Sequence, residues 1–144
     1  ARALAFGGNL LAIAAYTSNA VTVADLSNPA IPVFRATVKH EVNGFNNLAG
    51  PRALALSSNL LAVAAYTSSA VTLVDVSSPT APVLRSVVQH GVGGVTQLFR
   101  PSALALFQRN SRMLMAVTAS GSGAVSVFIS AVNCSGVEMK GSNP

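Results

Sequence analysis

The chain repeats itself at a spacing of 50 residues, and this repeat limits the folds open to it. Residues 9–18 read NLLAIAAYTS, and residues 59–68 read NLLAVAAYTS. The similarity continues without a gap to the end of both copies, and a third copy opens on the same spacing with Ala-Leu-Ala at residues 103–105. Such internal similarity indicates a repeat architecture in which each copy forms one supersecondary unit.

Each copy holds four short segments with strand character, separated by turn residues. In the first copy, residues 2–6 alternate, residues 10–16 are an apolar run, residues 20–25 are β-branched, and residues 33–38 are partly polar. The apolar run is too short for a helix, so we expect a strand covered on both faces. Four consecutive strands per copy predict an antiparallel meander, the blade of a β-propeller. A solenoid is the alternative, but its turns usually contain a helix, and none is predicted here.

The predicted fold is therefore an all-β propeller with four-stranded antiparallel blades at residues 1–50, 51–100 and 101–144. The third copy falls four residues out of step within residues 107–112, which predicts a longer turn there. In the first blade, residues 33–38 are expected to be the most exposed strand. Closed propellers need about four to eight blades, so three blades leave two uncovered sheet faces. We expect a dimer that closes a ring, a filament, or the remaining blades of a longer propeller.

Two segments, residues 21–33 and 71–83, resemble the LVIVD repeat, which typically reads L-x-I-V-D-V-S-N-P-x-x-P-V. The resemblance covers nearly all of the first two copies. The third copy departs from it, because Ile129 stands where Asp25 and Asp75 stand in the others. This family implies a β-propeller, often on secreted or surface proteins of microbes, and no settled enzymatic activity. The resemblance therefore informs the fold more than the function.

Charged side chains are scarce, with nine Lys and Arg, four Asp and Glu, two His and a net charge of +5. The basic residues are scattered, so no nucleic-acid binding is predicted. We find no apolar stretch long enough to span a membrane, and the low-charge composition favours an extracellular or cell-surface location. Cys134 is the single cysteine, which excludes an intrachain disulfide. The chain begins inside a repeat and without Met, as a processed or partial chain would.

Residue types that carry catalysis are few. Four acidic residues and two histidines supply little general acid–base chemistry, and no nucleophile triad, phosphate loop or dinucleotide motif is visible. His40 and His90 belong to different copies and lack clustered carboxylate or thiolate partners. Asp25 and Asp75 precede Ser-x-Pro turns, where each should accept hydrogen bonds from nearby backbone N–H groups. We predict no catalytic residue, no metal and no cofactor.

A candidate binding face lies where the turn between the second and third strands meets the long loop to the next copy. In a blade these two segments lie at the same end, and long loops are where binding residues concentrate. The expected ligand is a glycan or a protein, with ordinary solvated loops as the alternative. The candidate residues are Tyr16, Thr17, His40, Asn43, Phe45, Tyr66, Thr67 and His90.

Taken together, these features predict a non-enzymatic extracellular structural or interaction module that acts through blade-to-blade assembly or protein binding. Two alternatives stay open: a lectin-like propeller that binds carbohydrate through the repeated loop face, and blades of a larger propeller enzyme. Residues 133–135 read Asn-Cys-Ser, which makes Asn133 a candidate N-glycosylation site.

Overall fold

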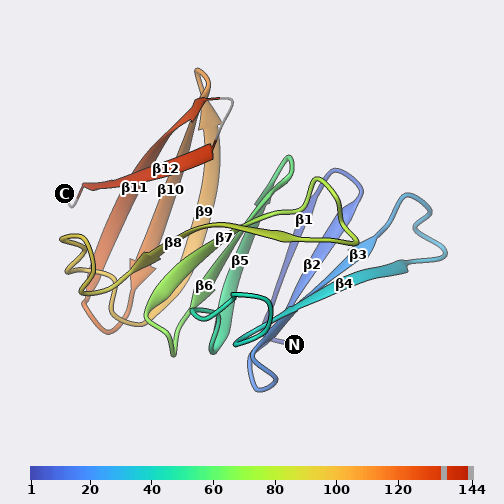
Figure 1. Cartoon of the computed structure of the whole chain (residues 1–144), viewed down its shortest axis with the longest axis horizontal. Coiled ribbons are helices and arrows are strands. Elements are labelled where there is room, and N and C mark those ends of the chain that lie inside the picture. Colours follow the sequence, from blue (N-terminus) through green and yellow to red (C-terminus); the bar gives the residue numbers. More distant parts are fainter. Residues whose placement is uncertain (134–135, 143–144) are drawn as a thin grey trace.

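The computed structural model describes residues 1–133 and 136–142, and within them the chain is all-β, with twelve strands and no helix. The strands form three separate four-stranded antiparallel sheets in chain order, and no strand among the described residues joins one sheet to another (Figure 1). We call them sheet 1 (β1–β4), sheet 2 (β5–β8) and sheet 3 (β9–β12). The strand bounds are β1 (Ala3–Gly7), β2 (Leu10–Ala15), β3 (Ala20–Asp25), β4 (Val33–Lys39), β5 (Pro51–Ser57), β6 (Leu60–Ala65), β7 (Ala70–Asp75), β8 (Val83–Gln89), β9 (Pro101–Arg109), β10 (Arg112–Ala119), β11 (Ala124–Asn133) and β12 (Gly136–Ser142).

Sheets 1 and 2 are copies of one another at the level of residue pairing. Leu10 pairs with Asp25 in sheet 1, and Leu60 pairs with Asp75 in sheet 2. The turns that separate the strands contain residues in the left-handed region, such as Gly8 with a φ of 57°. Glycine adopts this conformation without steric strain, which is why short turns favour it. The predicted all-β fold with four antiparallel strands per copy is thus confirmed.

The extra residues of the third copy do not form the longer turn that the sequence predicted. Instead they lengthen β9 and β10, so that Gln108 pairs with Met113 and Arg109 pairs with Arg112. The two residues that remain, Asn110 and Ser111, have φ values of 49° and 60°. Two left-handed residues in succession close a tight hairpin whose twist matches that of the strands. The inserted residues therefore extend the ladder, and the hairpin tip projects beyond the rest of sheet 3 (Figure 1).

The three sheets pack face to face in a fan, with β1 next to β5 and β5 next to β9 (Figure 1). Sheet 1 presents small side chains, including Ala12 and Ala14, to Leu61 and Val63 of sheet 2. Sheet 2 repeats this arrangement with its other face, where Ala62 and Leu73 pack against Met115 and Phe128 of sheet 3. Each join therefore places alanines of one sheet's second strand among larger apolar side chains of the next sheet.

We expected the apolar run of each copy to be covered on both faces. Of the first two copies, this holds for β6 in sheet 2 and not for β2 in sheet 1. All six residues of β6 are buried. In β2, the equivalent strand, Ala12 and Ala14 are buried but Leu11 and Ile13 are only half-buried, because no described segment covers the outer side of sheet 1. The prediction for residues 10–16 was therefore wrong on one face. The expected exposure of β4 is confirmed, since six of its seven residues are exposed or partly so and Val38 alone is buried.

Sheets 1 and 3 each leave one apolar face uncovered. On the outer face of sheet 1, Leu4 is 57% exposed and Phe6 is 64% exposed. On the outer face of sheet 3, Phe107, Val125 and Ile129 are 58%, 48% and 39% exposed. Large apolar side chains exposed together in this way commonly mark an interaction surface.

Candidate functional site

The loop that follows sheet 1 ties sheets 1 and 2 together at one end of the strands. The His40 N–H donates to the Asn19 carbonyl at 2.9 Å, and the Gly50 N–H donates to the Asn19 side chain at 2.8 Å. On the other side of the loop, the Thr67 N–H donates to the Ala49 carbonyl at 3.1 Å. The turn residues and the long loop therefore meet at one end, as the sequence predicted. We call this the loop end, comprising residues 16–19, 40–50, 66–69, 90–100 and 119–123.

The loop after sheet 2 repeats this docking on sheet 3. The His90 N–H donates to the Ser69 carbonyl at 2.9 Å, and the Arg100 N–H donates to the Ser69 hydroxyl at 3.2 Å. The Ser120 N–H then donates to the Arg100 carbonyl at 3.1 Å. The loops after sheets 1 and 2 thus make similar hydrogen bonds to the next sheet, although their side chains differ.

One of these places shows a paired exchange of glycine between the two copies. Gly50 has a φ of 64°, and a Cβ added to it would lie 2.3 Å from the Thr67 hydroxyl oxygen. In the second loop Arg100 takes this position, with a φ of 58°. The residue opposite it is now Gly121, where an added Cβ would lie 2.4 Å from a ring carbon of Phe99. In the second loop the glycine thus lies in the turn of the next sheet, against Phe99, and the loop has an arginine where the first loop has Gly50.

Arginine and aromatic side chains lie next to one another at the loop end, from sheet 1 across sheet 2 to the loop that precedes sheet 3. The guanidinium carbon of Arg2 lies 5.6 Å from the Tyr16 ring centre, and the Tyr16 and Tyr66 ring centres are 6.5 Å apart. Arg52 and Arg100 lie 4.6 Å and 5.6 Å from the centre of the Tyr66 ring. These distances are those of cation–π contacts. We call this set the arginine–tyrosine row; its members are Arg2, Tyr16, Arg52, Tyr66, Phe99 and Arg100.

The structure gives different places to the predicted site residues. Tyr16 and Tyr66 meet in the row, and Thr17 and Thr67 lie exposed beside them in the turns. Asn43 is also exposed, at a left-handed turn position with a φ of 52°.

Phe45 is a correction to the predicted binding face. Its side chain is 5% exposed and belongs to the core between sheets 1 and 2. The Glu41 N–H donates to the Phe45 carbonyl at 3.0 Å, which helps to fold this part of the loop back on itself. Phe45 therefore anchors the loop by apolar burial and is not available to a ligand at the surface.

The two histidines support the loops in different ways. The Nδ1 atom of His40 accepts a hydrogen bond from the Leu48 N–H at 3.3 Å, and its Nε2 atom lies 3.8 Å from Glu41. The Nδ1 atom of His90 is buried and has no hydrogen-bond partner among the described residues. Its ring instead packs 5.5 Å from the ring of Phe99. The two predicted site histidines are thus part of the loop packing.

Asp25 and Asp75 lie at the opposite end of the sheets and accept the turn hydrogen bonds that were predicted. The Ser27 and Ser77 N–H groups each donate to the preceding aspartate at 2.8 Å. Each carboxylate also forms an ion pair that the sequence reasoning missed, Asp25 with Arg35 and Asp75 with Arg85. Hydrogen bonds from the serine side chains, with the arginine as a further cause, lower the pKa of both carboxyls to about 2.

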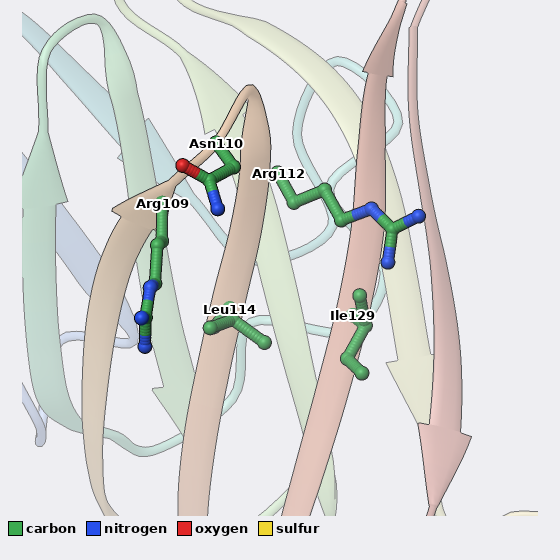
Figure 2. A pocket seen from close by; sticks show the side chains of 5 residues that line it. All are labelled: Arg109, Asn110, Arg112, Leu114 and Ile129. Atoms are coloured by element: carbon green, nitrogen blue, oxygen red, sulfur yellow. The ribbon is translucent and has the colours of Figure 1, made fainter.

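Two of the hollows on the surface of the described residues bear on the site. One of about 180 Å³ lies at the loop end beside the Tyr16 ring, with Arg2, Thr17 and Ser18 in its lining. The other, of about 450 Å³, lies on the outer face of sheet 3. Figure 2 shows the Arg109 side chain alongside Leu114 and the Arg112 side chain above Ile129, and all four residues line this hollow. The first hollow adjoins the arginine–tyrosine row, and the second is part of an uncovered apolar face.

Two sequence features bear on location. Within the described residues there is no helix with the length and apolar character needed to cross a membrane. The candidate glycosylation site Asn133 ends β11, and the residues 134–135 that complete its motif lie outside the described residues.

Comparison with known proteins identifies the fold and no function. No protein-family model matches the chain, and no curated protein matches it. Among solved structures, the chain is similar to a functionally unknown protein from Desulfotomaculum acetoxidans DSM 771, with a TM-score of 0.65 and 13% sequence identity. The match covers 94% of this chain and 39% of the other, so this chain spans well under half the length of that protein.

Proposed function

We propose that the three sheets are propeller blades of the LVIVD type, and that the chain is a non-enzymatic structural and interaction module whose uncovered faces bind a second copy. The main support is that the uncovered outer face of sheet 1 has the same residue positions as the face of sheet 2 that sheet 1 covers. Leu11 and Ile13 occupy the positions that Leu61 and Val63 occupy in sheet 2. In sheet 2 that face is fully buried under sheet 1.

The outer face of sheet 3 supplies the complementary half of such a join. Ala103 pairs with Thr118 and Ala105 pairs with Ala116 on this face. The equivalent positions in sheet 2 are small residues, including Ala62, and they pack against sheet 3. A second copy could therefore place its sheet 3 on this chain's sheet 1 in the manner of the two internal joins.

The loops support the same alignment. The Thr72 hydroxyl, fully buried, donates to the Asn47 carbonyl at 2.9 Å, and the Ser126 hydroxyl donates to the Gln97 carbonyl at 3.3 Å. Each loop thus docks on the third strand of the next sheet. Thr22, the equivalent residue of sheet 1, is half-buried, and its hydroxyl instead forms a hydrogen bond with the Thr37 hydroxyl at 3.3 Å. Sheet 1 therefore has the residue that would receive a preceding loop.

Such a join is heterologous, because it brings together two different faces. Two copies joined in this way at both ends would close a ring of six blades, which is within the usual range for propellers. Copies that do not close would grow into a filament. The same faces would receive neighbouring blades if the sheets belonged to a longer propeller, as the length of the similar solved structure suggests. A secreted or cell-surface location suits this role and the low content of charged residues.

The join between copies differs from the join of sheets 1 and 2 at the place where Gly7 meets Leu56. A Cβ on Gly7 would lie 2.7 Å from a side-chain carbon of Leu56, so that join needs a glycine there, whereas sheet 2 has Ser57 at the equivalent position. Sheet 3 has Phe107 at the position of Gly7, and sheet 1 has Phe6 at the position of Leu56. We expect these two phenylalanines to pack together and to hold the sheets further apart at this end.

The test uses variants that block one face each. Phe6→Glu blocks sheet 1, Val125→Glu blocks sheet 3, and Ile31→Glu is a matched control, because Ile31 is 64% exposed like Phe6 but lies in the loop before β4. Sedimentation should show single chains for each blocked variant and an unchanged particle for the control. A mixture of the two blocked variants should form a two-chain particle through the one intact join. Dimerisation of either blocked variant alone, or dissociation of the control, would contradict a heterologous join.

A further inference from the structure

The three arginines of the arginine–tyrosine row form no ion pair with any carboxylate whose position the structure describes. The ion pairs among the described residues are Asp25–Arg35 and Asp75–Arg85 at the far end of the sheets, and His40–Glu41. Arg2, Arg52 and Arg100 have no carboxylate within ion-pair distance in the described part of the chain. A guanidinium presents several N–H donors in a planar fork that matches the oxygens of a carboxylate or sulfate. The row is therefore chemically suited to oxyanions.

Arg100 is held there in spite of an unfavourable backbone. Its φ of 58° lies in the left-handed region, where residues with a Cβ are strained and glycine is not. The first copy has Gly50 at this position, and Gly121 stands where the second sheet has Thr67, the residue that a Cβ on Gly50 would meet. Backbone strain of this kind concentrates at functional sites. Two positions thus differ together, with the result that a third guanidinium joins the row.

The surroundings offer room and further donors for a ligand. The hollow of about 180 Å³ beside Tyr16 is lined by Arg2 and by the hydroxyl-bearing Thr17 and Ser18. Arg100 contacts both Tyr66 and Phe99, at 5.6 Å and 5.1 Å from their ring centres, so these rings fix the guanidinium from two directions. Held in this way, the side chain loses less freedom when it binds an anion.

The aromatic rings of the row decide between classes of ligand. Single-stranded nucleic acids and neutral sugars bind to aromatic side chains whose faces are free for stacking. In the row, guanidinium groups already lie over the Tyr16 and Tyr66 rings. The charges also lie at intervals, with Arg2 on the Tyr16 ring and Arg52 and Arg100 on the Tyr66 ring 6.5 Å away, which suits an extended chain that carries several charges. We infer that the arginine–tyrosine row binds an acidic polysaccharide, with carboxylate or sulfate groups on the guanidinium groups and sugar hydroxyls on Thr17 and Ser18.

The inference can be tested by calorimetric titration of the full chain with four probes: heparin oligosaccharides, oligogalacturonate, neutral dextran and oligo(dT). The key variant is Arg100→Gly, which restores the residue of the first copy and removes the strained conformation, so the fold should be retained. The matched control is Arg109→Gln, which removes one positive charge from the β9–β10 hairpin tip, outside the row. Thermal unfolding of each variant checks that the fold is intact.

We expect at least one of the two acidic oligosaccharides to bind, and which one binds distinguishes sulfate from carboxylate. Arg100→Gly should weaken that binding about tenfold, the loss of one charge-assisted hydrogen bond. Arg109→Gln should change it by less than about twofold, as expected for an exposed charge remote from the ligand. Three results would overturn the inference: no binding of either acidic probe, an equal loss in both variants, or tighter binding of dextran or oligo(dT) than of the acidic oligosaccharides.

Discussion

The contact between Gly50 and Thr67 allows a quantitative test of how the loop docks on sheet 2. In Gly50→Ala, alanine must adopt a φ near 64°, which costs about 1 kcal/mol in the left-handed region. The new Cβ also meets the Thr67 hydroxyl oxygen at 2.3 Å and its Cβ and backbone nitrogen at 3.0 Å and 3.1 Å. Relieving such overlap in a packed contact costs about 1–3 kcal/mol. The free energy of unfolding should therefore fall by about 2–4 kcal/mol.

A matched control separates the two contributions. Gly44 has a φ of 85°, and a Cβ on it would have no atom within 4 Å, so Gly44→Ala should cost only the backbone term, about 1 kcal/mol. The exchange seen at Arg100 and Gly121 suggests a rescue. In Gly50→Ala combined with Thr67→Gly, the side-chain overlap disappears, and we expect a favourable coupling of about 1–2 kcal/mol.

Urea denaturation at one fixed protein concentration, followed by far-UV circular dichroism, measures the four variants Gly50→Ala, Gly44→Ala, Thr67→Gly and Gly50→Ala/Thr67→Gly on one scale. A fixed concentration is needed because binding between copies would otherwise change the apparent stability. Equal losses for Gly50→Ala and Gly44→Ala would show that the overlap with Thr67 carries no energy. Strictly additive effects in the double variant would show that the two residues do not meet, and either result would refute the docking described for this loop.

Two further predictions concern the core and the ion pairs. Leu61→Ala should lower the free energy of unfolding by about 2–5 kcal/mol at any protein concentration because Leu61 is fully buried. Leu11→Ala should cause an equal loss only at concentrations where copies assemble. Equal losses for the two variants in dilute single chains, measured by denaturation, would contradict this. Because Asp25 and Asp75 have pKa values lowered to about 2, their stabilisation is complete above the ordinary pKa near 3.8 and is lost as the pH falls through about 2. Stability titrated from pH 5 to pH 2 should therefore decrease in the parent chain and more weakly in Asp25→Asn/Asp75→Asn, and parallel curves would refute the assignment.

Local patterns in the sequence were sufficient to predict the strands, because each depends on residues close together in the chain. The apolar run at residues 10–15 and the turn at Gly8 identify a strand and its start, and the repeat transfers both to residues 60–65. The burial of β6 and the exposure of one face of β2 could not be distinguished, because the two sequences are almost identical and differ only in what covers them. Whether a face of either strand is buried depends on how many sheets there are and in what order they pack, and the local pattern holds no information on this.

The candidate site was predictable only in part for the same reason. The meeting of the turn at Tyr16 with the long loop follows from the meander, and it was predicted. The Asp25–Arg35 pair could have been predicted from the hairpin pairing of β3 with β4, since the two residues are ten apart around one turn. The arginine–tyrosine row joins residues from two copies, and the burial of Phe45 depends on how its loop packs between sheets 1 and 2. Neither the row nor the burial of Phe45 can be predicted from a single stretch of sequence.

The central claim is that the uncovered faces of sheets 1 and 3 bind one another between copies. The most direct measurement is the absolute mass of the native particle by light scattering, taken over a wide range of protein concentration. Two complementary faces on each chain predict a two-chain particle of constant mass, the closed ring of six sheets, with the single chain appearing only on strong dilution. A particle that stays a single chain of 14.6 kDa at every concentration would contradict the claim.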